Sequence, residues 1–174
     1  MMKKFKDWFS SLKEPSISAS YSERPSSAIP HEKSLIEQLK AEHQTLINLF
    51  TDVVKLAENK RYDKAINVLE TFRSQLTEHL IKENTKLYLF LNAHYRHEQN
   101  QFMKVSKLRK EMTSITKALM EFAQQWRLQG LNDSNRNRFV NQALPLSDIL
   151  IKRLKVEEKE LFSLYENSLN KLSA

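Results

Sequence analysis

The sequence predicts an all-α protein: an antiparallel up-down-up-down four-helix bundle preceded by a short amphipathic helix. Two observations support this fold class. The 174 residues include a single Gly and four Pro, and a β-sheet protein needs more turn-forming residues than that. Long segments of the chain also repeat apolar residues at alternating steps of three and four, a spacing that places them in one stripe along a helix. Such stripes pack against partner helices at a shallow crossing angle.

Four segments carry the stripes that build the predicted bundle. They are residues 36–57, 65–90, 105–126 and 143–164. Polar residues at 58–61 and 92–100 separate the first three, and Gly130 suits a left-handed C-cap after the third helix. Pro145 is expected to interrupt the fourth helix near its start. Because short connections make neighbouring helices antiparallel, the four helices should run up, down, up and down.

The first 33 residues differ from the rest of the chain. Residues 1–14 predict a short basic amphipathic helix, whose apolar face carries Phe5, Trp8, Phe9 and Leu12. We expect this helix to dock on the bundle or to fray, and contact with a membrane surface is the alternative. Residues 15–33 are rich in Pro and Ser and predict a flexible linker, so the bundle domain should span residues 34–171. We expect residues 1–30 to be dispensable for folding.

Composition narrows the classes of function. The chain has no Cys, which excludes disulfides and thiolate metal sites. Its net charge of +7 favours acidic surfaces in general, but the sequence shows no nucleic-acid recognition motif, so we expect no specific nucleic-acid partner. No uninterrupted apolar stretch is long enough to cross a bilayer, and no signal-peptide core with a cleavage site is present. We therefore expect a cytoplasmic protein.

Five positions on the apolar stripes are occupied by histidine or charged residues. They are His43 on the first helix, His79 and Glu83 on the second, and Arg153 and Glu157 on the fourth. An unpaired buried ion costs several kcal/mol, so charges on a buried stripe need partners or a ligand. All five residues lie near the middle of their helices, and antiparallel packing brings those midpoints to one level. We therefore predict that they form one buried, mutually contacting cluster.

Two interpretations of this cluster remain open. Inward Glu and His side chains from facing helices are a common way for a bundle to hold iron or manganese, which would make the cluster a metal centre. Alternatively, the cluster is a metal-free ion-pair network, in which Arg153 neutralises Glu83 and Glu157 while the histidines hydrogen-bond around them. Two carboxylates and one guanidinium leave a net charge of −1, which one divalent ion or one imidazolium would offset.

The order and spacing of these residues resemble the hemerythrin, or HHE cation-binding, domain family over residues 35–165. The family pattern has a His on the first helix, then His-x-x-x-Glu followed by Leu-Tyr or Leu-Phe on the second. The matching residues are His43, His79-Leu80-Ile81-Lys82-Glu83 and Leu87-Tyr88. Residues 153–162 are similar to the closing His-x-x-x-Glu-Glu-x-x-Leu-Phe of the family, with Arg153 in the position of the His.

The metal ligands that the resemblance implies are His43, His79, Glu83 and Glu157. Family members that hold a di-iron centre also place two histidines one turn apart on the third helix, where this chain has Met112 and Thr116. The ligand set is therefore incomplete for two ions. It implies at most one metal, a non-haem iron or another divalent ion, and a degenerate site that binds no metal is the alternative.

The expected function is that of a hemerythrin-like domain protein that binds non-haem iron and acts as a sensor, a store or a regulator. The alternative is a metal-free protein-interaction bundle that sequesters a regulatory partner, as small anti-sigma bundles do. An enzyme is the third hypothesis, since redox catalysis needs an open coordination position on the metal. Glu158 and Glu160 are expected to face solvent.

Overall fold

The computed structural model describes residues 34–172, and their side chains as far as Ser168. The predicted amphipathic helix at residues 1–14 and the predicted linker at residues 15–33 lie outside the described residues. Every element within residues 34–172 is helical, and none of these residues forms a strand. The predicted all-α helical bundle is confirmed.

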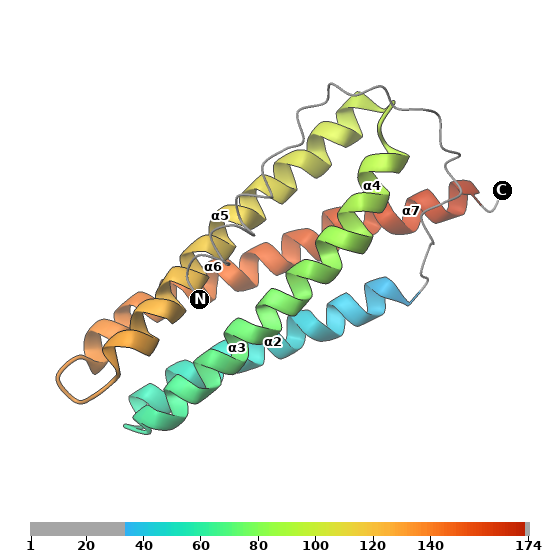
Figure 1. The fold of residues 1–174 in the computed structure, drawn as a ribbon. Coiled ribbons are helices and arrows are strands. Elements are labelled where there is room, and N and C mark those ends of the chain that lie inside the picture. The colour runs from blue at the N-terminus through green and yellow to red at the C-terminus, as the bar shows by residue number, and fades with distance from the viewer. Residues whose placement is uncertain (1–33, 173–174) are drawn as a thin grey trace.

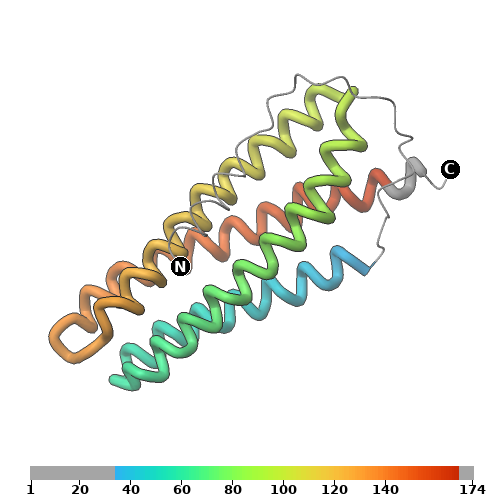
Figure 2. Tube along the Cα trace, in the orientation of Figure 1, coloured from blue at the N-terminus to red at the C-terminus, as the bar shows by residue number. Residues whose placement is uncertain are grey.

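Four helical arms make up the described part of the chain. They are α2 (Leu35–Glu58); α3 (Tyr62–Lys82) with the π-helical turn η2 (Glu83–Leu87) and α4 (Tyr88–His94); α5 (Gln99–Gln129); and α6 (Arg136–Glu157) with the π-helical turn η3 (Glu158–Phe162) and α7 (Ser163–Leu172). Figure 1 shows the arms side by side, with the α2–α3 and α5–α6 connections at one end and the α4–α5 connection at the other. The trace in Figure 2 follows the same course, so successive arms run in opposite directions.

The apolar core consists of two clusters placed one after the other along the bundle. The larger cluster extends from Leu46 on α2 to Leu154 on α6 and occupies the end with the α2–α3 and α5–α6 connections. The smaller cluster includes Leu39 on α2 and Leu161 at η3 and lies toward the other end. Between the two clusters, α2, α3 and α6 place polar side chains in the core.

Two local features correct or refine the sequence expectations for the end of α5 and the start of α6. Gly130 ends α5 with φ 70 and ψ 164, so its φ is positive as expected, but its ψ is extended and not that of a left-handed helix. Pro145 lies inside α6, and the expectation that it interrupts the helix is wrong. Pro145 and Asn141, whose carbonyl loses its partner, both lie on the exposed face, where water replaces the lost hydrogen bond. Phe139 and Ala143, buried in the core, hold the first turns in place.

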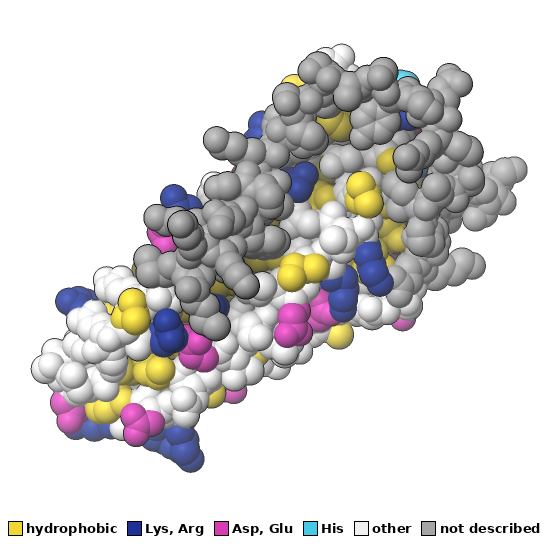
Figure 3. Space-filling model, in the orientation of Figure 1, with side chains coloured by type: hydrophobic (Ala, Val, Ile, Leu, Met, Phe, Trp, Pro, Cys, Tyr) yellow, Lys and Arg dark blue, Asp and Glu magenta, His cyan; other side chains and the backbone are white. Residues whose placement is uncertain are grey.

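The surface in view mixes both signs of charge. Figure 3 shows basic and acidic side chains interspersed with scattered apolar ones on the described part of this face. No helix within residues 34–172 is long and apolar enough to span a membrane.

Candidate metal centre

A polar layer fills the gap between the two apolar clusters. It contains the five residues singled out on the stripes, and each of them is at most 5% exposed: His43, His79, Glu83, Arg153 and Glu157. Each comes from a helix whose neighbouring stripe positions are apolar and buried, so the packing of those positions turns the polar side chain inward. The predicted burial is therefore observed for all five residues.

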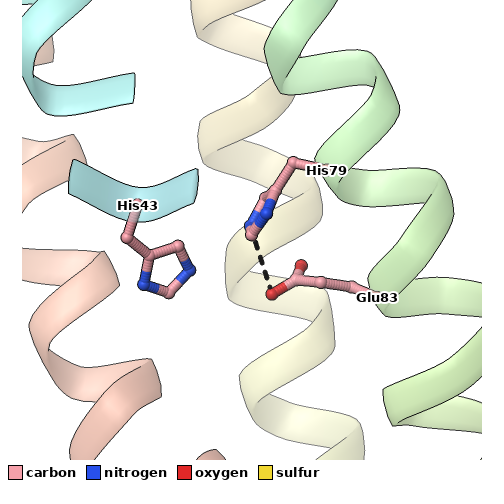
Figure 4. A group of neighbouring side chains, drawn as sticks. All are labelled: His43, His79 and Glu83. Atoms are coloured by element: carbon pink, nitrogen blue, oxygen red, sulfur yellow. Dashed lines mark ion pairs between the residues drawn. The ribbon is translucent and has the colours of Figure 1, made fainter. Parts of the chain in front are cut away.

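Three of these side chains converge on one point between α2 and the α3 arm. The ligand atoms of His43, His79 and Glu83 all lie within 4.8 Å of one another. His79 Nε2 is 3.3 Å from Glu83 Oε1, because the two residues are one turn apart on the same helical arm. Figure 4 shows the His43 ring directed toward this pair from α2. The ring centroids of the two histidines are 4.9 Å apart.

The atoms that face this point have no hydrogen-bond partner. They are His43 Nε2, His79 Nε2 and the carboxylate oxygens of Glu83; Glu157 Oε2, which lies outside this group at 3.9 Å from His43 Nε2, is unpaired as well. His79 and Glu83 are within ion-pair distance, but their geometry is not that of a hydrogen bond. Buried polar atoms are rarely left unpaired, since each one costs about 1–3 kcal/mol. Unpaired imidazole nitrogens and carboxylate oxygens that converge are suitable donors for a divalent cation.

The opposite edge of each histidine ring is held by a carboxylate at the edge of the layer. His79 Nδ1 donates to Glu42 Oε2 at 2.9 Å, and His43 Nδ1 donates to Glu158 Oε1 at 2.8 Å. Lys82 donates in turn to Glu42. Both histidines therefore use Nδ1 for a hydrogen bond and turn Nε2 toward the common point.

Glu157 connects this point to the far side of the layer. Its Oε1 accepts a hydrogen bond from the buried Tyr88 hydroxyl at 3.0 Å and lies 3.9 Å from Arg153 Nη2. Its Oε2 is directed the other way and lies 3.9 Å from His43 Nε2. One carboxylate thus faces the candidate cation ligands with one oxygen and a guanidinium with the other.

Arg153 lies inside the bundle, but its partners are not all those expected from the sequence. Its Nη2 donates to the Leu108 carbonyl at 2.8 Å and its Nη1 donates to Glu111 at 3.4 Å, both on α5. Among the ion pairs of residues 34–168, none joins Arg153 to Glu83. Of the two pairs in the metal-free interpretation, the structure therefore shows the one with Glu157, at 3.9 Å, while the other Arg153 contacts are to α5.

The third long helix presents no imidazole to the layer. Met112 and Thr116 on α5 are buried, and the Thr116 hydroxyl has no hydrogen-bond partner. These are the positions at which the resemblance implies two histidines. The candidate site therefore draws its donors from α2, the α3 arm and α6, while α5 supplies the carbonyl and the carboxylate that hold Arg153.

The two histidines differ in their protonation. Burial alone lowers the pKa of His79, but the Glu83 carboxylate and the hydrogen bond to Glu42 outweigh it and raise the value to about 10. Burial and the charge of His79 lower the pKa of His43 to about 4, against the opposing effect of Glu158. At neutral pH and without a metal, His79 is an imidazolium and His43 is neutral.

The pKa values of two glutamates, Glu157 and Glu42, are also shifted. Burial and the neighbouring Glu83 carboxylate raise the pKa of Glu157 to about 8, so this group holds a proton at neutral pH. The hydrogen bond from His79, together with Lys82 and against the effect of burial, lowers the pKa of Glu42 to about 2. The metal-free layer therefore keeps its charge balanced with protons that a bound cation would displace.

Sequence reasoning missed two residues that contact the site. Glu42 was not singled out, and Glu158 was expected to face solvent, although each holds a histidine ring. The signal was present in the chain, because Glu42 directly precedes His43 and Glu158 directly follows Glu157. A carboxylate next to a ligand position lies at the flank of the stripe, where it reaches the neighbouring helix. Glu160, whose side chain is 38% exposed like that of Glu158, pairs instead with Lys104 at 3.1 Å.

A helical bundle with His and Glu side chains converging in its core belongs to the class of cation-binding four-helix bundles. The family model of the hemerythrin HHE cation binding domain matches residues 34–165, so this chain belongs to the hemerythrin HHE family. The resemblance seen in the sequence is thereby confirmed, and with it a cation-binding domain. Searches of curated proteins and of solved structures each returned no significant match.

Proposed function

We propose that this domain binds one divalent cation, iron in the cell, through His43, His79 and Glu83, with Glu157 as a further ligand. The observation that carries the proposal is the set of buried donor atoms that converge without partners. The residues fit such an ion, because each histidine already uses Nδ1 for a hydrogen bond and leaves Nε2 for the cation. Without a ligand, these atoms would be an unexplained cost in the middle of the core.

The donor types support iron, and their number supports a single ion. Two imidazoles and one carboxylate form the ligand set that proteins use for non-haem Fe(II). A second ion would lie near Arg153, and two divalent ions beside a buried guanidinium would leave a large uncompensated positive charge. The α5 positions that could supply more ligands carry Met112 and Thr116. A single ion also matches the carboxylates available, Glu83 and Glu157.

The burial of the site supports a sensing, storage or regulatory role. A bound iron would supply a redox-active centre, and the chain would hold that centre among buried side chains between two apolar clusters. A change in occupancy or charge there would act on three helical arms at once, since the ligands come from α2, the α3 arm and α6. Such coupling suits a protein whose state is read by a partner.

The test is the metal content and metal affinity of the full chain, purified without a His tag. We expect about one iron per chain, and we expect Co(II) to saturate at one ion per chain with the visible absorption of a bound ion. His79→Ala should abolish tight binding, because it removes a ligand, whereas His97→Ala, at an exposed residue, should leave it unchanged. If the wild-type chain binds neither ion, the polar layer is a metal-free network and the proposal fails.

A further inference from the structure

The carboxylates that hold the two histidines come from other helices than the histidines themselves. Glu42 on α2 accepts from His79 on α3, and Glu158 at the start of η3 accepts from His43 on α2. The hydrogen bonds therefore connect α3 to α2 and α2 to the α6 arm at the level of the candidate site. Neither carboxylate lies on an apolar stripe, and both are partly exposed at the edge of the layer.

Each of these hydrogen bonds determines which ring nitrogen is left for a ligand. A histidine that donates Nδ1–H to a carboxylate keeps its other nitrogen, Nε2, for a metal, and the hydrogen bond also fixes the plane of the ring. In this structure both Nε2 atoms are buried, face the common point and have no hydrogen-bond partner. The same arrangement occurs twice, on two histidines that are far apart in the sequence. Packing alone gives no reason for both rings to adopt it.

We propose that Glu42 and Glu158 are positioning residues of the cation site, each acting through the histidine that it holds. The proposal rests on the proposed function and adds to it. It assigns the residues that orient the histidine ligands and make their imidazoles better electron-pair donors to the cation. Lys82 belongs to the same arrangement, since it donates to Glu42 and fixes the carboxylate from the solvent side. Among the described residues, Glu158 pairs with no Lys or Arg, and the ring of His43 is its partner.

The two carboxylates make a specific prediction about binding strength. Loss of a carboxylate that holds a ligating histidine typically weakens metal binding by about 10–100-fold. We expect Glu42→Ala and Glu158→Ala each to weaken Co(II) binding to the full chain within this range, with one ion per chain still bound at saturation. Glu42→Gln and Glu158→Gln should lose less, because the amide oxygen still accepts the Nδ1–H bond. This partial rescue distinguishes a hydrogen-bonding role from a contribution to packing.

Glu160→Gln is the matched control. Glu158 and Glu160 lie in the same π-helical turn and their side chains are equally exposed, at 38%. Glu160, however, pairs with Lys104 and not with a histidine. The same change of charge at this position should leave the Co(II) affinity within about twofold of the wild-type value, an effect of about 0.4 kcal/mol or less.

A second measurement identifies which ring has lost its partner. In the Co(II) protein, the Nδ1–H protons of two ligating histidines should give two exchangeable, paramagnetically shifted proton NMR signals. Glu42→Ala should move or broaden one of them through exchange with water, and Glu158→Ala should affect the other. Circular dichroism of each variant, matched to the wild type, establishes that the bundle is intact.

The outcomes separate this proposal from the proposed function. Weaker binding in both Ala variants, with one altered NMR signal each, supports the positioning role. Wild-type binding that is unchanged in both Ala variants overturns the positioning role and leaves the proposed function intact. A wild-type chain that binds no Co(II) overturns both.

Discussion

At the scale of single residues, two groups of the polar layer keep protons in the folded chain that they would lose in the unfolded chain. The pKa of Glu157 is raised to about 8 from an ordinary value of 4.5, and that of His79 is raised to about 10 from 6.5. Both groups therefore bind a proton more tightly in the folded chain than in the unfolded chain. His43 acts in the opposite sense, because its pKa falls from 6.5 to about 4. Its effect is largest between pH 4 and 6.5, where it offsets that of Glu157, and it fades above pH 6.5.

These shifts predict how the stability of the metal-free protein depends on pH. Between pH 6.5 and 8 the unfolded chain has lost protons that folded Glu157 and His79 retain, so a rise in pH favours unfolding. We expect the free energy of unfolding to fall by at least about 1 kcal/mol per pH unit across this window. Urea unfolding of the chelator-treated protein at pH 6.5, 7.2 and 8 measures it.

Glu157→Gln is the control for this pH dependence. The amide keeps the shape of the protonated acid but has no proton to lose, so its stability should fall less steeply with pH than that of the wild type. A wild-type stability that stays flat or rises from pH 6.5 to 8 would mean that the layer does not hold these protons.

At the scale of helical elements, the two π-helical turns keep the inward residues of two arms on the core face. Inward residues on two arms follow steps of four without a step of three: His79, Glu83, Leu87 and Leu91, and Arg153, Glu157, Leu161 and Tyr165. In an α-helix each step of four rotates the side chain by about 40° away from the previous one. Three such steps would carry the last residue off the core face, yet all eight are buried. The wider i→i+5 turns of η2 and η3 take up the extra residue and restore the phase.

This origin of η2 predicts that one of its residues can be removed. Deleting Thr85, an exposed residue within η2, should convert the π-helical turn to an α-helical one, in which Glu83 and Leu87 become three positions apart and still share the buried face. We expect the bundle to fold with a loss of less than about 2 kcal/mol in the free energy of unfolding. The shift along the helix axis should move Tyr88 away from Glu157. Urea unfolding followed by circular dichroism measures the loss.

A deletion in a regular part of the same arm is the comparison. Thr71 in α3 is also exposed, and its hydroxyl bonds to the carbonyl four residues before it, as that of Thr85 does. Its deletion should rotate Ala65 and Leu69 by about 100° relative to the rest of the arm and prevent folding. An equal loss in the free energy of unfolding from the two deletions would show that η2 does not contain an extra residue.

At the scale of the whole molecule, the sequence predicts the bundle and the polar layer for the same reason. Burial imposes a period on a helix, so apolar residues reveal the stripe, and a charge on the stripe reveals a group that must face the core. His43, His79 and Glu83 were found in this way. The adjacency of Glu42 and Glu158 to stripe positions was too weak a signal to assign them a role, since a glutamate at a stripe flank is ordinary and only the packing of the neighbouring helix gives it a histidine to hold. The direction of Arg153 toward α5 likewise depends on how the arms pack.

The packing of all four arms at one level can be tested by adding ligands from the other two sides. Met112 on α5 is buried and directly follows Glu111, which Arg153 contacts. Histidines at positions 112 and 153 should therefore both face the layer. Replacing Arg153 also removes the buried positive charge that opposes additional metal. We expect the double variant Arg153→His with Met112→His to bind Co(II) at least about tenfold more tightly than the wild type, a gain of about 1.4 kcal/mol, or to take up a second ion. Titration followed by visible absorption measures both quantities.

The matched control places the second histidine on the same helix but away from the layer. Met120 is also a buried methionine of α5 in the same apolar cluster as Met112, and it lies about two turns further along the helix. Arg153→His with Met120→His should therefore gain no more than Arg153→His alone, because the imidazole at position 120 is too far along the bundle to join the other ligands. If both double variants bind Co(II) as the wild type does, α5 does not present position 112 to the histidines of α2 and α3, and the site is confined to those two helices and Glu157.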